Sequence, residues 1–365
     1  MKLVTIVGAR PQFVKAAAVS RALEGHAGIT EVLVHTGQHY DANMSEVFFS
    51  ELGIPAPRHW LGIGSGSHGD QTGRMLAAIE TVLVGEHPDC VLVYGDTNST
   101  LAGALAAAKL HIPVAHVEAG LRSFNRAMPE EINRVVTDHL SDWLYAPTST
   151  AVANLAHEGI AGKKVLPVGD VMLDAALFHA SHSDLQSGIL ESLGLSAGGF
   201  VLATVHRAEN TDDAVRLAEV FAALNTIAGH ERVVMPIHPR TRQALIQQAF
   251  TPAPGLCFID PVGYIDMVAL ECGARLVVTD SGGVQKEAFF HRVPCVTLRA
   301  ETEWTELVES GWNTLVPPTG RVAMTEGMLA AMARPLPADW PPFYGVGDAA
   351  AKIAAALAKL TGHVR

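Results

Sequence analysis

Short apolar runs rich in β-branched residues recur along this chain, and each is followed by a small or charged residue and then by a helical pattern. In the first half these runs occupy residues 3–7, 31–36, 90–94, 114–117 and 143–146. In the second half they occupy residues 201–205, 233–237, 256–259, 276–278 and 295–298. Strands that alternate with helices are typical of parallel, doubly wound sheets. Two series of such runs therefore predict two α/β domains.

A segment of different character separates the two series. Residues 168–187 contain a Gly-Asp turn, a short helical stretch and a polar His-Ser segment. We place the boundary there, with the second domain covering residues 169–348. The stretch from 349 to 360 has an alanine-rich helical pattern with no strand after it. We expect this helix to return to the first domain, which would then comprise residues 1–168 and 349–365.

Composition and charge narrow the class of protein. The 365 residues exceed the usual size of one core, and 48% of them are hydrophobic while only 17% are charged. A net charge of −11 argues against wrapping a nucleic acid backbone. The four cysteines stand far apart, which favours neither a zinc site nor a disulfide framework. No apolar run approaches the length of a membrane span, so we expect a cytoplasmic protein without membrane contact.

The segment from residue 279 to 287 predicts an anion-binding turn at the start of a helix. Ser281, Gly282 and Gly283 follow an apolar strand, and such small residues let backbone N–H groups approach a phosphate closely. Glu287 follows within the first turns, where its carboxylate could accept the hydroxyls of a ribose. An ordinary strand-to-helix turn, in which serine caps the helix and glycine relieves strain, explains the same residues.

Ionisable residues also follow other predicted strands. In doubly wound sheets, ligands bind beyond the carboxyl ends of the strands. Such residues occur here in segments 8–15, 95–98, 116–122, 206–210 and 238–240, besides the turn at Ser281. A single histidine or aspartate at a strand end is more often a cap or a turn residue. Six strand ends that all carry ionisable residues favour a site around a nucleotide. In that site the first domain supplies carboxylates, and the second supplies cationic and backbone donors.

Residues 64–69 match the G-x-G-x-x-G pattern of dinucleotide-binding proteins. Their context differs from that of such proteins, because no long apolar strand precedes them and no acidic residue closes a second strand at the expected distance. We interpret them as a flexible glycine-rich loop. A nicotinamide-dependent oxidoreductase is therefore disfavoured.

Several motifs together resemble the non-hydrolysing UDP-N-acetylglucosamine 2-epimerases. In order along residues 2 to about 320, they are Arg10-Pro11 with Lys15, Gly95-Asp96-Thr97, the His116 to Arg122 segment, Pro129-Glu130-Glu131 with Asn133-Arg134, His206-Arg207 with Glu209-Asn210, and Asp280 to Glu287. The resemblance implies two Rossmann-like domains in a GT-B arrangement, a cleft for a UDP-sugar, and usually a homodimer. It also implies interconversion of the gluco and manno configurations at C2 without a metal or a nicotinamide cofactor.

The resemblance further implies roles for particular residues. The catalytic carboxylates would be Asp96, Glu118 and Glu130, with Glu130 favoured over Glu131 because it directly follows Pro129. His206 would stabilise the departing UDP. The substrate-binding residues would be Arg10, Lys15, Arg134 and Arg207 for charge neutralisation, Ser281, Gly282 and Gly283 for phosphate, and Glu287 for the ribose.

Departures from the family pattern bear on the substrate. The segment from 36 to 45 lacks the arginine of the family's Gln-His-Arg pattern, so the resemblance does not extend to activation by a second UDP-sugar. Residues 301–307, with 169–172 and 71–73, resemble the branch that acts on UDP-2,3-diacetamido-2,3-dideoxy-glucuronate in surface polysaccharide pathways. UDP-N-acetylglucosamine itself is the close second substrate.

Two other classes of function remain as alternatives. A GT-B glycosyltransferase would use the same phosphate turn, but would have less use for three carboxylates near C2. In a module that only binds a nucleotide sugar without catalysis, buried acids beside the anionic ligand would weaken the binding.

If the substrate is the uronate, Arg299 or Arg74 could meet its C6 carboxylate, and Trp304 would lie near the sugar or in the core.

Overall fold

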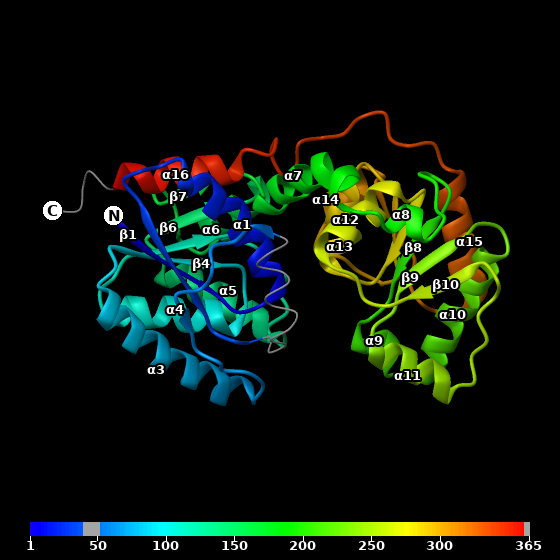
Figure 1. Ribbon diagram of the computed structural model, residues 1–365, viewed down its shortest axis with the longest axis horizontal. Helices are drawn as coiled ribbons and strands as arrows, with labels where there is room; N and C mark the ends of the chain where they lie inside the picture. The colour runs from blue at the N-terminus through cyan, green and yellow to red at the C-terminus, as the bar shows by residue number, and fades with distance from the viewer. Residues whose placement is uncertain (39–51, 361–365) are drawn as a thin grey trace. The chain divides into compact units, whose positions relative to one another are not determined.

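The computed structural model describes residues 1–38 and 52–360 (Figure 1). The chain forms two compact units, Met1–Ala175 with Pro342–Arg365 and Ala176–Pro341. Most of the 36–45 segment, where the family arginine is missing, lies outside the described residues.

The first unit is built on a seven-stranded sheet in the order β3-β2-β1-β4-β5-β6-β7, with every neighbouring pair parallel. The central strands are almost completely buried runs of valine, leucine and isoleucine, as expected for a sheet covered by helices on both faces. The strands are β1 (Lys2–Val7), β2 (Thr30–His35), β3 (His59–Trp60), β4 (Cys90–Tyr94), β5 (Val114–Val117), β6 (Trp143–Ala146) and β7 (Val165–Pro167).

The helices of the first unit begin at recognisable caps. Thr97 accepts a hydrogen bond from the backbone N–H of Thr100, and Ser67 accepts one from Asp70. The final helix of the chain, α16, packs on α1 in this unit (Figure 1). The helices are α1 (Arg10–Glu24), α3 (His68–Glu86), α4 (Asn98–Lys109), α5 (Pro129–Leu140), α6 (Ser149–His157) and α16 (Ala349–Leu360); α7 (Val171–Gln186) runs from this unit into the second.

The second unit repeats the plan with a six-stranded parallel sheet in the order β10-β9-β8-β11-β12-β13. The strands are β8 (Val201–Thr204), β9 (Val233–Pro236), β10 (Leu256–Ile259), β11 (Leu276–Thr279), β12 (Cys295–Thr297) and β13 (Asn313–Leu315). The helices are α8 (Ile189–Ser192), α9 (Ala208–Thr211), α10 (Ala214–Ala228), α11 (Pro239–Gln247), α12 (Tyr264–Gly273), α13 (Gly282–Phe290), α14 (Thr305–Glu309) and α15 (Arg321–Ala333).

The predicted fold class, two Rossmann-like α/β units, is confirmed, and each predicted strand is present. Three strands were not predicted: β3, β7 and β13. All three lie at or beside the edge of a sheet, span two or three residues, and are only partly buried. Because partial burial needs no continuous apolar run, these strands leave little hydrophobic signal in the sequence.

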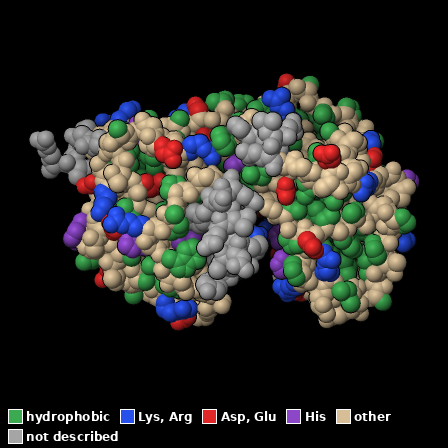
Figure 2. Space-filling model, in the orientation of Figure 1, with side chains coloured by type: hydrophobic (Ala, Val, Ile, Leu, Met, Phe, Trp, Pro, Cys, Tyr) green, Lys and Arg blue, Asp and Glu red, His purple; other side chains and the backbone are tan. Residues whose placement is uncertain are grey.

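The surface carries charges of both signs. Acidic and basic side chains are interspersed on the face shown in Figure 2, so the described residues of that face form no continuous basic stripe. Among the described helices, none is long and apolar enough to cross a membrane.

Candidate active site

The turn between β1 and α1 is fixed by its smallest residue and by a glutamine. A Cβ atom on Gly8 would lie 2.1 Å from Oγ1 of Thr36, so only glycine fits at this position. The buried Gln12 side chain accepts hydrogen bonds from two backbone N–H groups of the turn, at 2.8 and 3.1 Å. Its amide donates to the carbonyl of Tyr94 at 2.8 Å. The turn that precedes Arg10, the first residue of α1, is therefore tied to the neighbouring strand β4.

Lys15 of α1 and Glu118, which follows β5, form an ion pair with both side chains only 10% exposed. Gly95 permits this approach, because a Cβ atom there would lie 3.2 Å from the Glu118 carboxylate and 3.4 Å from the Lys15 ammonium. Glu118 itself has a φ of +72°, a left-handed conformation that costs a non-glycine residue about 1–3 kcal/mol. Its backbone N–H donates to the carbonyl of Tyr145 at 3.1 Å. Glu118 thus lies directly after β5, at the carboxyl edge of the sheet, with its carboxylate paired to Lys15.

Asp96 is held by the side chain of Arg134 at the same edge. One guanidinium nitrogen of Arg134 lies 2.5 Å from the Asp96 carboxylate, and the other lies 2.8 Å from that of Glu131. The Asn133 amide donates to the Asp96 carbonyl at 2.8 Å. Burial raises the pKa of Asp96, with Arg134 opposing the shift and Glu118 adding to it. Asp96 is therefore suited to accept and release a proton.

The adjacent acids Glu130 and Glu131 have different surroundings. The buried Glu131 carboxylate accepts hydrogen bonds from the backbone N–H groups of Ser123 and Phe124, each at 2.9 Å. Although burial opposes the effect, these bonds and Arg134 hold the pKa of Glu131 below its usual value. The half-buried Glu130 carboxylate has no hydrogen-bond or ion-pair partner within residues 1–38 and 52–360. Glu130, rather than Glu131, is thus available to a ligand.

His116 and its partners form a closed network in the first unit. Its Nδ1 lies 2.7 Å from the Asp138 carboxylate, and its Nε2 lies 2.8 Å from the carbonyl oxygen of Gly95. Arg122 approaches the other carboxylate oxygen at 2.7 Å. The side chains of His116 and Asp138 are completely buried. Both ring nitrogens are occupied, so this strand-end histidine maintains the fold rather than meeting a ligand.

Asp280 organises the corresponding edge of the second unit. Its buried carboxylate accepts hydrogen bonds from the backbone N–H groups of His206 and Arg207, at 3.1 and 3.0 Å. It also accepts one from the Asn210 amide at 2.9 Å. The ring Nδ1 of His206 lies 3.4 Å from the same carboxylate, while its side chain remains 52% exposed. The segment after β8 is thereby attached to the end of β11.

The predicted phosphate turn forms the start of α13. Ser281 occupies the position before the helix without capping it through its side chain, and its backbone N–H donates to Oγ1 of Thr279 at 2.9 Å. The helix begins at Gly282, and Gly283 is exposed. Glu287 lies half-buried one turn further along the helix. Backbone N–H groups at such a helix start form a suitable site for a phosphate.

The segment that follows β12 packs on this turn. The Trp304 indole donates to the Gly282 carbonyl at 3.0 Å, and the Lys286 ammonium lies 4.3 Å from the centre of the ring. Trp304 is 8% exposed, as a core residue would be. Arg299 pairs with Glu303 at 2.9 Å and Arg74 pairs with Asp70 at 2.7 Å. Each arginine proposed for a C6 carboxylate thus already has an acidic partner.

The structure brings together two groups of the predicted site residues. Lys15, Asp96, Glu118 and Arg134 meet in the first unit, where Arg10 is the first residue of α1 and Glu130 is the second residue of α5. In the second unit, His206 and Arg207 share Asp280, which directly precedes Ser281, Gly282 and Gly283 of the predicted phosphate turn.

Sequence reasoning did not give Gln12, Asn133, Asp138 or Asp280 a role of their own. All four are buried polar residues, and three of them lie inside or beside motifs that were noted. For Asp280 a signal was available, because a polar residue directly after a buried apolar strand must find hydrogen-bond partners. Gln12, Asn133 and Asp138 lie in helices, where the sequence gives no such signal.

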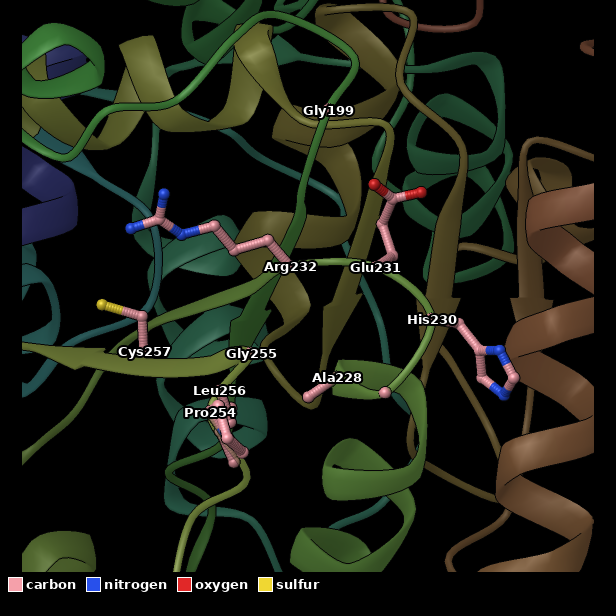
Figure 3. Close-up of a pocket in the computed structure, with 10 residues that line it drawn as sticks. Gly199, Ala228, His230, Glu231, Arg232, Pro254, Gly255, Leu256 and Cys257 are labelled. Atoms are coloured by element: carbon pink, nitrogen blue, oxygen red, sulfur yellow. The ribbon is translucent and has the colours of Figure 1, made fainter.

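A pocket of about 560 Å³ lies at the opposite edge of the second sheet, before the starts of β8, β9 and β10. Figure 3 shows that the side chains of His230, Glu231 and Arg232 point in different directions rather than toward a common centre. Ligands of doubly wound sheets bind at the carboxyl edge. This pocket is therefore not part of the candidate site.

Comparison with known proteins agrees with this geometry. The family model for UDP-N-acetylglucosamine 2-epimerase matches residues 21–358. The UDP-2,3-diacetamido-2,3-dideoxy-D-glucuronate 2-epimerase of Pseudomonas aeruginosa is 53% identical over 363 residues, covering 99% of this chain and 100% of that protein. The crystal structure of Methanocaldococcus jannaschii UDP-GlcNAc 2-epimerase with UDP-GlcNAc and UDP matches with a TM-score of 0.87 and 42% identity, covering 98% and 100% of the two chains.

The Neisseria meningitidis UDP-GlcNAc 2-epimerase bound to UDP-GlcNAc also matches with a TM-score of 0.87, at 31% identity over 98% of this chain and 100% of that one. The resemblance predicted from the sequence motifs is thereby confirmed. This chain belongs to the UDP-N-acetylglucosamine 2-epimerase family.

Proposed function

We propose that this protein interconverts the gluco and manno configurations at C2 of UDP-2,3-diacetamido-2,3-dideoxy-glucuronate. The observation that carries the proposal is the 53% identity, over almost the whole chain, to a P. aeruginosa protein named for that reaction. The sequence of residues 301–307 supports the same branch. A role in surface polysaccharide synthesis and a homodimeric state belong to the proposal, and the expected cytoplasmic location stays a prediction.

The chemistry of C2 explains why several acids are needed. The C2 proton is not adjacent to a carbonyl, so simple deprotonation would leave an unstabilised carbanion. Departure of UDP as the proton leaves avoids this, because the C2–H electrons form the C1–C2 double bond of a 2-acetamidoglucal while the C1–O electrons leave with UDP. The oxygen of UDP then returns to C1, and a proton is delivered to the other face of C2.

In this mechanism Asp96, Glu118 and Glu130 carry protons to and from the two faces of C2. A positioned acid or base of this kind is worth about 10²- to 10⁴-fold in rate. The arrangement of Asp96 between Arg134 and Glu118 supports such a role, since its carboxyl is neither fully solvated nor saturated with donors. Arg134 would also offset the charge that develops beside it.

The second unit would hold the nucleotide. Backbone donors at Ser281, Gly282 and Gly283 receive a phosphate, and Glu287 binds the ribose. His206 and Arg207 stabilise the departing UDP, with further charge neutralisation from Arg10 and Lys15. Support for this assignment comes from the exposed His206 ring and from the uncapped start of α13.

A competition experiment tests the substrate assignment. Equal concentrations of UDP-2,3-diacetamido-2,3-dideoxy-glucuronate and UDP-N-acetylglucosamine are incubated with the enzyme, and NMR and mass spectrometry follow both. We expect the uronate to be consumed first, because it has the higher kcat/KM, and no lag or sigmoidal kinetics with either sugar. Preferential consumption of UDP-N-acetylglucosamine would reverse the assignment within the family while leaving epimerisation intact.

UDP-N-acetylglucosamine is the alternative substrate. Proteins of that name from M. jannaschii and Methanococcus maripaludis are 47% and 45% identical to this chain. A GT-B glycosyltransferase is a more distant alternative, and incubation with a UDP-sugar but no acceptor separates it from an epimerase. In deuterated water, the epimerised product should carry deuterium at C2. A product without solvent hydrogen there would contradict the elimination mechanism.

A further inference from the structure

Asp280 contacts both the backbone and the ring of His206. Its carboxylate is completely buried, and three donors fix it in place: the backbone N–H groups of His206 and Arg207 and the side chain of Asn210. The His206 ring extends from this anchored backbone, and its Nδ1 lies 3.4 Å from the same carboxylate. The backbone and the ring of one residue thus both meet one aspartate.

The two ring nitrogens of His206 consequently have different environments. A neutral imidazole carries its proton on one nitrogen, and the neighbour of each nitrogen decides which one. A carboxylate beside Nδ1 favours the proton on Nδ1. The ring is 52% exposed, so Nε2 on the far side can reach a ligand. A small rotation of the ring would shorten the 3.4 Å separation to a hydrogen bond, as often happens when a ligand binds.

We propose that Asp280 is the positioning residue for His206. It holds the ring with Nδ1–H toward the carboxylate and Nε2 toward the leaving diphosphate. It also stabilises the protonated ring, whose Nε2–H donates a hydrogen bond to the oxygen released from C1. When UDP returns to C1, the same donor withdraws. Asp280 also directly precedes Ser281, so it fixes the histidine relative to the phosphate turn. This inference rests on the role proposed above for His206 in the departure of UDP.

The wild-type protein alone provides the first test. Histidine labelled with ¹⁵N allows long-range ¹H–¹⁵N spectra, with the His206 signals assigned by their loss in His206→Gln. At about pH 9, where an ordinary imidazole is neutral, we expect a protonated Nδ1 and an unprotonated Nε2. The opposite tautomer in the wild-type protein would overturn the proposal. Because no substrate is present, this measurement is independent of the proposed reaction.

A double-mutant cycle provides the second test. Asp280→Asn should lower kcat by about 10²-fold or more, because the amide can favour the wrong tautomer, while the Kd of UDP stays within about threefold. In a His206→Ala background the same change should cost less than about threefold, since its effect passes through the ring. An equal loss of kcat in both backgrounds would show that Asp280 supports the fold alone, and would overturn the proposal.

Asn210→Ala is the matched control. This change removes one donor to the Asp280 carboxylate but leaves both contacts with His206. We expect kcat within about threefold of wild type and no change of tautomer. If wild-type enzyme epimerises none of the UDP-sugars, the proposed function fails, whereas the NMR result still decides whether Asp280 sets the state of the ring.

Discussion

Each unit of this protein carries a histidine–aspartate pair near the carboxyl edge of its sheet, and the two pairs differ in what surrounds the ring. In the first unit, His116 lies between Asp138 and a backbone carbonyl and is completely buried. In the second unit, Nδ1 of the His206 ring lies 3.4 Å from Asp280, and the side chain is 52% exposed. The sequence presents both histidines in the same way, as polar residues at the end of an apolar strand.

The difference separates a pair that stabilises the fold from a pair that, in the proposed function, acts on the departing UDP. Asp138 also meets Arg122 and the N–H of Gly120, so its charge is completely used inside the unit. Asp280 is equally buried, but two of its donors are backbone N–H groups, and the side chain of the histidine beside it is half exposed. A histidine whose two ring nitrogens both have partners inside the protein is a poor candidate for catalysis, even when it lies in a motif.

The largest expected effect concerns the carboxylates rather than either histidine. If the buried His116–Asp138 pair takes no part in the chemistry, proton transfer in the proposed mechanism falls to Glu118, Asp96 and Glu130. Glu118→Gln should therefore lower kcat by about 10³- to 10⁴-fold, with UDP affinity within about tenfold, because shape is kept and proton transfer is lost. Steady-state kinetics and UDP titration measure both quantities. Near wild-type turnover would remove Glu118 from the mechanism.

Removing the Asp138 charge from the buried His116–Asp138 pair should lower the free energy of unfolding. Asp138→Asn leaves Arg122 buried beside an uncharged amide, and loss of one partner from a buried ion pair typically destabilises by about 3–5 kcal/mol. Urea denaturation gives the free energy of unfolding. Glu158→Gln is the matched control: it removes the other, 26% exposed partner of Arg122 and should cost about 1 kcal/mol or less. Equal losses of unfolding free energy in the two variants would show that the buried partner of Arg122 stabilises the fold no more than the exposed one.

For the His206–Asp280 pair the opposite result is expected: His206→Ala should lower kcat without lowering the free energy of unfolding. Removal of a preorganised donor to a developing charge costs about 10²- to 10³-fold in kcat, or roughly 3–4 kcal/mol in the activation free energy. The ring is half exposed, so the free energy of unfolding should stay within about 0.5 kcal/mol of wild type. A large loss of stability with normal kcat would make this pair structural as well.

The central strands and the order of the site motifs could be predicted because both are local. Buried strands such as β4 and β11 are continuous apolar runs, and polar residues directly follow them. The partners of those residues could not be predicted in the same way. Asp280 meets a segment 74 residues away in the chain, and no local pattern specifies where its side chain points.

The adjacent acids of α5 show an intermediate case. Glu131 and Arg134 are three residues apart on a helix, which places their side chains on one face, so their ion pair could have been predicted. That pair leaves Glu130 as the carboxylate without a partner among the described residues. The anchoring of Ser123 and Phe124 by Glu131 could not have been predicted, because it depends on the path of the loop.

The smallest expected effect is the pH dependence of the closed pair. Although burial opposes it, His116 and Arg122 hold the pKa of Asp138 below its usual value of about 3.9. The stabilisation is therefore complete above about pH 4 and is lost as the pH falls through the pKa of the folded protein, at up to about 1.4 kcal/mol per pH unit. The difference in unfolding free energy between wild type and Asp138→Asn should shrink in this range, since the protonated acid resembles the amide. Urea denaturation between about pH 6 and 3 measures it, and other carboxylates cancel in the difference. A constant difference would mean that the Asp138 charge does not stabilise the fold, and the contrast between the two pairs would then rest on burial alone.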